Sequence, residues 1–144
     1  MAINSIIAGV DGSDSSRAAL LWAYDEATHH GASLTVLASW HPPALPMSPP
    51  YGSLPEEGYE RQPKTDALAL LDRFVAELEP RTPEVDVRTL IEEGSPAKVL
   101  IERSRDADLL VVGSRGLGGF AGMVLGSVSQ HLVAHAHCPV VVVR

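Results

Sequence analysis

The sequence predicts an α/β protein with a doubly wound, five-stranded parallel sheet and helices on both faces. Five short apolar segments alternate with four segments that repeat apolar residues at helical spacing. The connections are long enough to cross from one parallel strand to the next. Two strand segments, DLLVVGS and PVVVV, are apolar almost throughout, as in strands covered on both faces. Right-handed crossovers then give the doubly wound arrangement.

The first strand is expected at residues 4–11, NSIIAGVD, which are rich in apolar and β-branched side chains. Gly12 ends this strand. Asp14 is expected to cap a helix that runs to about His30, and Gly31 is expected to stop it.

A second strand and a long connection follow. Residues 32–40, ASLTVLASW, are predicted as the strand. Residues 41–63 hold seven of the 11 prolines of the chain, and neither a helix interior nor a central strand tolerates that density. We expect an extended surface connection there.

From Lys64 the helical period returns, and Pro80 ends the run. The side chains expected in the core from this helix are Leu68, Leu71, Phe74 and Val75.

Residues 85–92 alternate apolar and charged side chains, which predicts a strand with one wetter face. Ser95 and Pro96 are a cap and a first helical residue, and this helix is expected to reach about Arg105. The remaining elements are a strand, a helix and a strand, at residues 108–114, 127–137 and 139–144.

Composition limits the possible functions. The 144 residues predict a single domain, and the net charge of −7 would repel a nucleic acid backbone or an anionic membrane. Cys138 is the lone cysteine, which fits a reducing compartment. The N-terminus lacks the pattern of a signal peptide. We therefore expect a cytoplasmic protein without nucleic acid or membrane partners.

A glycine-rich loop is the strongest candidate site. Six of the 12 glycines lie in residues 113–126, between a buried strand and a helix, where backbone N–H groups typically bind phosphate. Residues 109–144 contain no Asp or Glu but keep Arg115. The two lysines, Lys64 and Lys98, lie outside the loop, which excludes a P-loop, and the first strand lacks a dinucleotide fingerprint.

The pattern Gly113-x2-Gly116-x9-Gly126-Ser127 resembles the signature of the ATP-binding branch of the universal stress protein family. The segments GVDGS, EGSPAKVL, DLLVVGSRG and HCPVVVVR resemble other blocks of the family, in the same order. The likeness extends over the chain except for residues 41–63. It implies the adenine-nucleotide α-hydrolase-like fold with strand order 3-2-1-4-5, and ATP as the ligand.

The resemblance also implies roles for single residues. Asp11 would approach the ribose and a divalent metal, Mg²⁺ or Mn²⁺, that the phosphates bridge. The backbone of Gly9 and Val10, with Ala38 and Ser39, would flank the adenine. The residues expected around the phosphates are Gly113, Arg115, Gly116, Gly126, Ser127, Val128 and Ser129.

Two of these residues have a simpler explanation as well. Ser127-x-x-Gln130 is a capping-box pattern, which by itself would account for the serine. Asp11 could merely cap the turn after its strand. His131 and His135 are interpreted as solvated surface residues rather than metal ligands.

The most favoured function is a stress-responsive ATP-binding module with at most slow ATP hydrolysis and no assigned catalytic residue. Two alternatives remain: a hydrolase or adenylating enzyme of the same fold, and a protein-interaction module without nucleotide.

The last strand, residues 139–144, carries four consecutive valines at an expected sheet edge. This predicts a homodimer in which the two copies of the strand pair. The alternative is a monomer in which residues 41–63 cover the edge.

Overall fold

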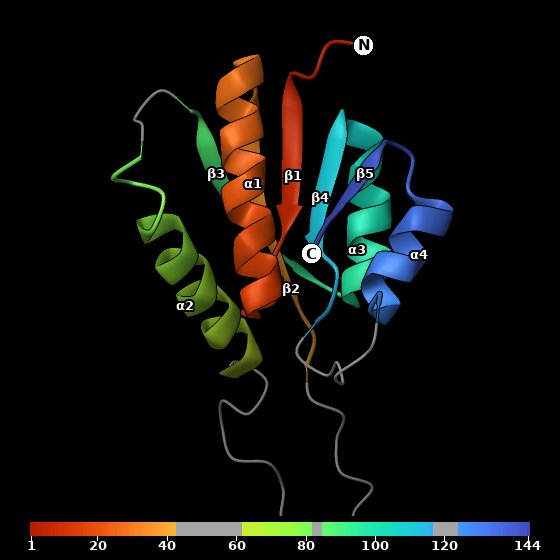
Figure 1. Ribbon diagram of the computed structural model, residues 1–144. Helices are drawn as coiled ribbons and strands as arrows, with labels where there is room; N and C mark the ends of the chain where they lie inside the picture. The colour runs from red at the N-terminus through yellow and green to blue at the C-terminus, as the bar shows by residue number, and fades with distance from the viewer. Residues whose placement is uncertain (43–61, 82–84, 117–123) are drawn as a thin grey trace, which may run out of the picture.

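The computed structural model describes residues 1–42, 62–81, 85–116 and 124–144. Five parallel strands form one sheet in the order β3-β2-β1-β4-β5, which confirms the predicted fold class and strand order (Figure 1). The strands are β1 (Ser5–Gly9), β2 (Ser33–Trp40), β3 (Val87–Glu93), β4 (Leu109–Gly113) and β5 (Val140–Val143).

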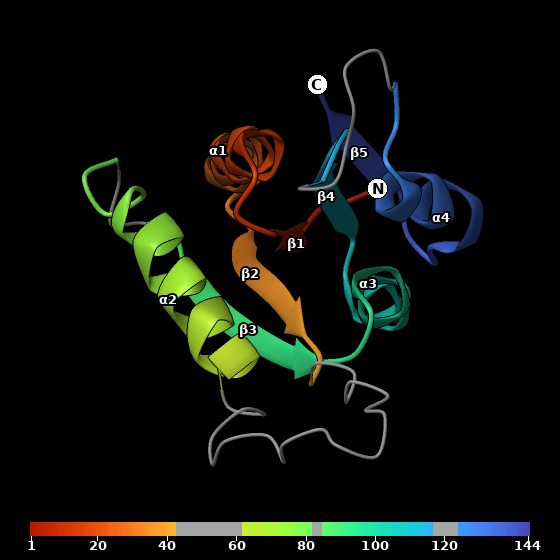
Figure 2. The same cartoon turned by 90° about the horizontal axis from the view of Figure 1, so that it is seen from below.

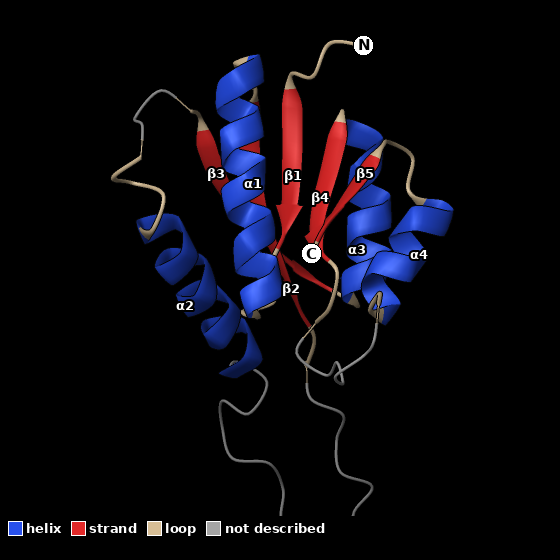
Figure 3. Ribbon diagram, in the orientation of Figure 1, coloured by secondary structure: helices blue, strands red, loops and turns tan. Residues whose placement is uncertain are grey.

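Helices cover both faces of the sheet, as Figures 2 and 3 show. They are α1 (Asp14–His30), α2 (Gln62–Ala76), α3 (Pro96–Arg103) and α4 (Ser127–His135), with a short 3₁₀ turn (Ser104–Asp106) after α3. Helices α1 and α2 pack on one face, and α3 and α4 pack on the other.

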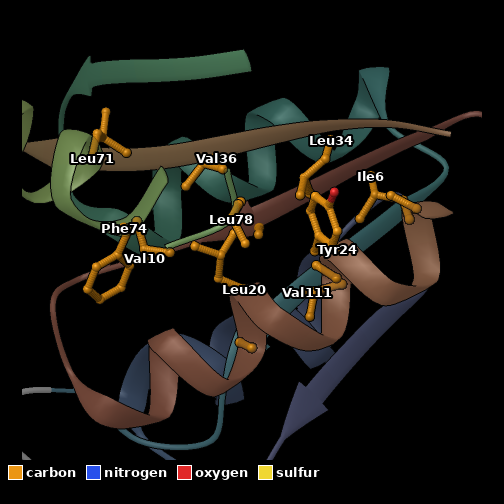
Figure 4. Packing of buried hydrophobic residues seen from close by; sticks show 14 of the residues in the cluster. Ile6, Val10, Leu20, Tyr24, Leu34, Val36, Leu71, Phe74, Leu78 and Val111 are labelled. Carbon is orange, nitrogen blue, oxygen red and sulfur yellow. The ribbon is translucent and has the colours of Figure 1, made fainter. Parts of the chain in front are cut away.

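The larger core lies between the sheet and the α1–α2 layer (Figure 4). Alternate residues of the central strands point into it, among them Ile6, Leu34 and Val111. Helix α1 adds Leu20 and Tyr24 from its buried side. A smaller core under α3 and α4 takes the intervening strand residues.

Two predicted details of the helices on the larger core are wrong. Ser13, not Asp14, caps α1, because its hydroxyl accepts a hydrogen bond from the N–H of Ser16 and Asp14 is already helical. Leu68 is not in the core and is 45% exposed. The buried stripe of α2 passes instead through Ala67, Leu71 and Phe74, so Leu68 lies about 100° round the helix from that stripe.

The predicted ends of several elements also differ. The first strand ends at Gly9, and helices α3 and α4 end two residues earlier than expected. Gly31 ends α1 in the left-handed conformation as predicted, with φ 65°. Most of the proline-rich connection, and Gly118, Gly119 and Gly122 of the glycine loop, lie outside the described residues.

Candidate functional site

The turn after β1 fixes the orientation of Asp11. Its Oδ1 accepts hydrogen bonds from the N–H of Ser13 at 2.9 Å and from the Ser13 hydroxyl at 2.5 Å. Gly12 turns the chain with φ 90°, a backbone conformation that residues with a Cβ rarely adopt. Asp11 thus has the local turn role considered from the sequence, but this role uses only one of its oxygens. Oδ2 lies 3.0 Å from the position a Cβ would take on Gly116.

The end of β4 lies against the start of α1. A Cβ on Gly113 would come within 2.6 Å of the carbonyl carbon of Ser15, so only glycine permits this approach. The N–H of Arg115 donates to the Ser15 hydroxyl at 3.3 Å. The β1 turn and the glycine loop therefore form one continuous rim at the carboxyl ends of the central strands.

The start of α4 brings backbone donors to the same rim. The N–H of Gly126 donates to the carbonyl of Ser114 at 2.6 Å. The Ser129 hydroxyl donates to that carbonyl at 3.2 Å and to the carbonyl of Gly126 at 3.0 Å. These bonds join the two ends of the glycine loop and orient the first turn of α4, whose N–H groups have no partner within the helix.

The capping box considered as the alternative explanation of Ser127 does not form. Gly126 is the N-cap residue, with φ −75° and ψ 168°, and no side chain caps the helix. Ser127 is already the first helical residue, and the Gln130 amide donates to the carbonyl of Leu125 instead. The Ser127 side chain is consequently not engaged as a cap, and a positive helix end faces the rim.

A cavity of about 880 Å³ opens at this rim. Eleven of the 12 predicted site residues line it, all except Ala38. Ala38 is buried in the larger core, and Trp40, two residues further along the same face of β2, reaches the cavity instead. The residues of β2 that reach the cavity are Leu37, Ser39 and Trp40.

Helix α2 supplies a wall of the cavity that the sequence did not reveal. One side of the helix faces it with Pro63, Asp66, Ala67, Leu70 and Arg73. These residues form no motif. The spacing of the apolar residues predicts a helix that packs on the core, and it does not indicate whether the same helix also lines a ligand cavity. Leu100 and Pro96 of α3 line the opposite side.

The charges around the cavity are mixed. Asp11 and Asp66 contribute carboxylates, and Arg73 and Arg115 contribute guanidinium groups. Lys64 lies just outside, with its ammonium 5.8 Å from the ring centroid of Trp40. An apolar pocket with a few convergent charges and a helix N-terminus suits a flat ring system joined to an anionic group.

The other candidate residues lie apart from the cavity. His131 is exposed, and its Nδ1 donates to the carbonyl of Ser127 at 2.7 Å. Cys138 packs against the smaller core, and burial, with Asp108 as a lesser cause, raises the pKa of its thiol. Within the described residues no three His, Cys, Asp or Glu side chains gather as metal ligands. No described helix is long and apolar enough to cross a membrane.

Comparison with known sequences gives a match over the chain. A model of the universal stress protein family matches residues 2–144. A universal stress protein of Mycolicibacterium smegmatis is 39% identical over 141 residues, which are 96% of this chain and 45% of that relative. The chain thus spans less than half the length of the curated relatives it matches.

Solved structures agree in fold. UspA from Lactobacillus plantarum superposes with a TM-score of 0.84 at 25% identity, covering 100% of this chain and 99% of that one. A universal stress protein in complex with cAMP superposes with a TM-score of 0.72 at 30% identity, covering 100% of this chain and 99% of that one. A family protein from Arabidopsis thaliana with AMP bound gives 0.64 at 25%, covering 97% and 90% of the two chains.

Proposed function

Because this chain belongs to the universal stress protein family, we propose that it binds ATP in the rim cavity and acts as a stress-responsive regulatory module. One observation carries the proposal: the β1 turn with Asp11, the glycine loop and the start of α4 line a single cavity. Relatives of the same fold bind cAMP and AMP, which supports an adenine nucleotide as the class of ligand.

The proposed pose follows from the chemistry of the walls. The phosphates would lie against the first turn of α4, where N–H groups and the helix dipole favour an anion. Arg115 would add a charged hydrogen bond, and the Ser127 hydroxyl would add a neutral one. The adenine would occupy the apolar part, between Leu100 and the end of β2 near Ser39.

The residues present fit a divalent metal only in company with the nucleotide. Asp11 has one oxygen engaged with Ser13 and the other directed at the rim beside Gly116. A single carboxylate together with phosphate oxygens is the usual protein environment of Mg²⁺. Mg²⁺ or Mn²⁺ bound in this way would neutralise phosphate charge next to Asp11.

Fast hydrolysis is not expected from this site. It requires a base or a water-orienting side chain next to the phosphates. The carboxylate of Asp11 lies beside Gly116 of the glycine loop, and holding a metal would leave it unable to act as a base as well. A single-turnover rate of about one per second or above, typical of enzymes, would contradict the binding-module proposal.

The test begins with the purified chain of 144 residues. Nucleotide extracted from fresh protein and identified by mass should be ATP. Calorimetry should then show ATP binding more tightly than AMP, cAMP or adenosine. Extraction of cAMP would redirect the proposal to a cyclic nucleotide, and a chain that binds none of the four ligands would refute it.

We also propose that the chain acts in the cytoplasm as a homodimer joined through residues 139–144. The lone Cys138 supports a reducing compartment. The position of β5 at the edge of the sheet supports the dimer.

A further inference from the structure

The wall formed by α2 places a guanidinium next to the proposed phosphate site. Arg73 lines the cavity, and its Nη2 lies 4.0 Å from the position a Cβ would take on Gly12. Gly12 directly follows Asp11, and the other side of the Asp11 carboxylate faces Gly116 of the glycine loop. Arg73 and the loop therefore approach the Asp11 corner from different walls of the cavity.

Ion pairs occupy about half of the described arginines, but neither of the two that line the cavity, Arg73 and Arg115. Four arginines are paired with carboxylates: Arg17 with Glu77, Arg81 with Asp25, Arg88 with Asp86 and Arg103 with Glu92. Within the described part of the chain Arg73 has no such ion pair. Its guanidinium carbon lies 5.7 Å from the ring centroid of Phe74, a contact that leaves its N–H donors available.

An unpaired guanidinium at a cavity of an acidic protein is suited to a phosphoryl group. Its planar fork donates two parallel hydrogen bonds to phosphate oxygens, and it stays charged at any physiological pH. The described ends of the glycine loop and the start of α4 line a different wall of the cavity from α2, so a polyphosphate held against them would have further oxygens for a second cationic group to bind. Arg73 is the described cationic side chain of α2 that lines this space.

We propose that Arg73 is a second phosphate-binding arginine, which makes α2 part of the nucleotide site and favours ATP over adenosine. The inference rests on the proposed function. A phosphate bound by Arg73 would connect α2 to the β1 turn and to the described ends of the glycine loop.

The experiment compares ATP and adenosine binding by calorimetry in wild-type, Arg73→Gln, Arg73→Lys and Arg81→Gln. Arg73→Gln should lower ATP affinity about tenfold or more, the usual loss for a charged hydrogen bond, and leave adenosine affinity unchanged. Arg73→Lys keeps the positive charge but loses the planar guanidinium, so its ATP affinity should lie between those of wild-type and Arg73→Gln. Arg81→Gln is the matched control, because Arg81 pairs with Asp25 outside the cavity, and it should bind like wild-type.

The outcomes distinguish the role of Arg73 from the proposed binding of ATP. Unchanged ATP affinity in Arg73→Gln, with ATP binding intact in wild-type, would overturn the role of Arg73 alone. Equal losses for ATP and adenosine would mean that Arg73 shapes the wall, which also overturns it. A wild-type chain that fails to bind ATP would refute both proposals. If Arg73→Gln does not fold by circular dichroism, a selective loss of ATP affinity in Arg73→Lys carries the test.

Discussion

At the scale of single residues, the proposed site depends on the absence of a branched side chain at Gly126. A Cβ there would lie 3.4 Å from both the Cα of Arg115 and the backbone N of Gly116. A methyl group fits at that distance, whereas the branches of a valine would cover the backbone that faces the phosphates. The φ of −75° is open to any residue, so the fold should survive.

Gly126→Val should therefore abolish ATP binding, and Gly126→Ala should weaken it less. Calorimetry measures the affinities, and thermal unfolding shows whether both variants fold like wild-type. ATP affinity that stays at the wild-type value in Gly126→Val would refute the phosphate-binding role of the loop.

Arg115 gives a second test at this scale. Its backbone is held by the Ser15 hydroxyl, so truncating the side chain should leave the loop in position. Arg115→Ala should cost about 1.5–3 kcal/mol of ATP binding, the range for a hydrogen bond to a charged group, with little effect on adenosine. Titration of both ligands checks this, and equal losses would assign Arg115 a structural role instead.

At the scale of elements, the carboxylate of Asp108 connects the start of β4 to the start of β1. Its Oδ2 accepts hydrogen bonds from the N–H of Asn4 at 2.9 Å, the N–H of Ser5 at 3.0 Å and the Ser5 hydroxyl at 3.3 Å. The backbone bonds from Asn4 and Ser5 lower the pKa of Asp108. The folded state therefore favours the ionised carboxylate.

This connection predicts a pH dependence of stability. A carboxylate with a lowered pKa in the folded state stabilises the fold above its unfolded pKa of about 3.9 and loses this contribution as pH falls through the lower folded value. Asp108→Asn should lower the urea midpoint at pH 7, and its difference from wild-type should shrink below about pH 4. Asp106→Asn, at an exposed position nearby, is the control. A difference that persists unchanged at low pH would contradict the prediction.

Local patterns predicted the elements because each one carries its own signal. Continuous apolar runs marked β4 and β5, and Gly31 marked the end of α1. The cap of α1 was misplaced by one residue, because Ser13 and Asp14 are both residues that commonly cap helices. The backbone conformation decides which of two such neighbours becomes the N-cap, and the residue types alone do not predict it. The first residue of α4, Ser127, was predicted correctly.

The site was predictable only where it follows a motif. The glycine spacing and Asp11 predicted residues that line the rim cavity, but no sequence pattern predicted that α2 forms one of its walls. Leu70 and Arg73 reach the cavity because α2 packs beside β2 and β3, a tertiary relation between segments far apart in the sequence. The side chain of Ala38 does not line the cavity, because it is buried in the larger core.

At the scale of the whole molecule, the sheet has β5 at one edge. The N–H groups of Leu110 and Ser114 donate to the carbonyls of Pro139 and Val143. In a parallel pair alternate residues bond to the neighbouring strand, so Val142 directs its backbone groups away from β4. An open edge of consecutive valines attracts other chains unless it is paired.

A two-fold axis that brings two copies of β5 together would satisfy this edge with antiparallel hydrogen bonds. Val142→Pro removes the outward N–H and keeps every bond to β4, so it should yield folded monomers. Val141→Pro is the contrasting variant, because the N–H of Val141 bonds to β4 and the loss of that bond should destabilise the sheet itself.

Changing Val141 and Val142 together to lysine should give monomers or insoluble protein, since these side chains pack against the two opposite cores. Light scattering coupled to size exclusion should report twice 15.3 kDa for wild-type and 15.3 kDa for Val142→Pro. A wild-type mass of 15.3 kDa at micromolar concentration would refute the paired edge.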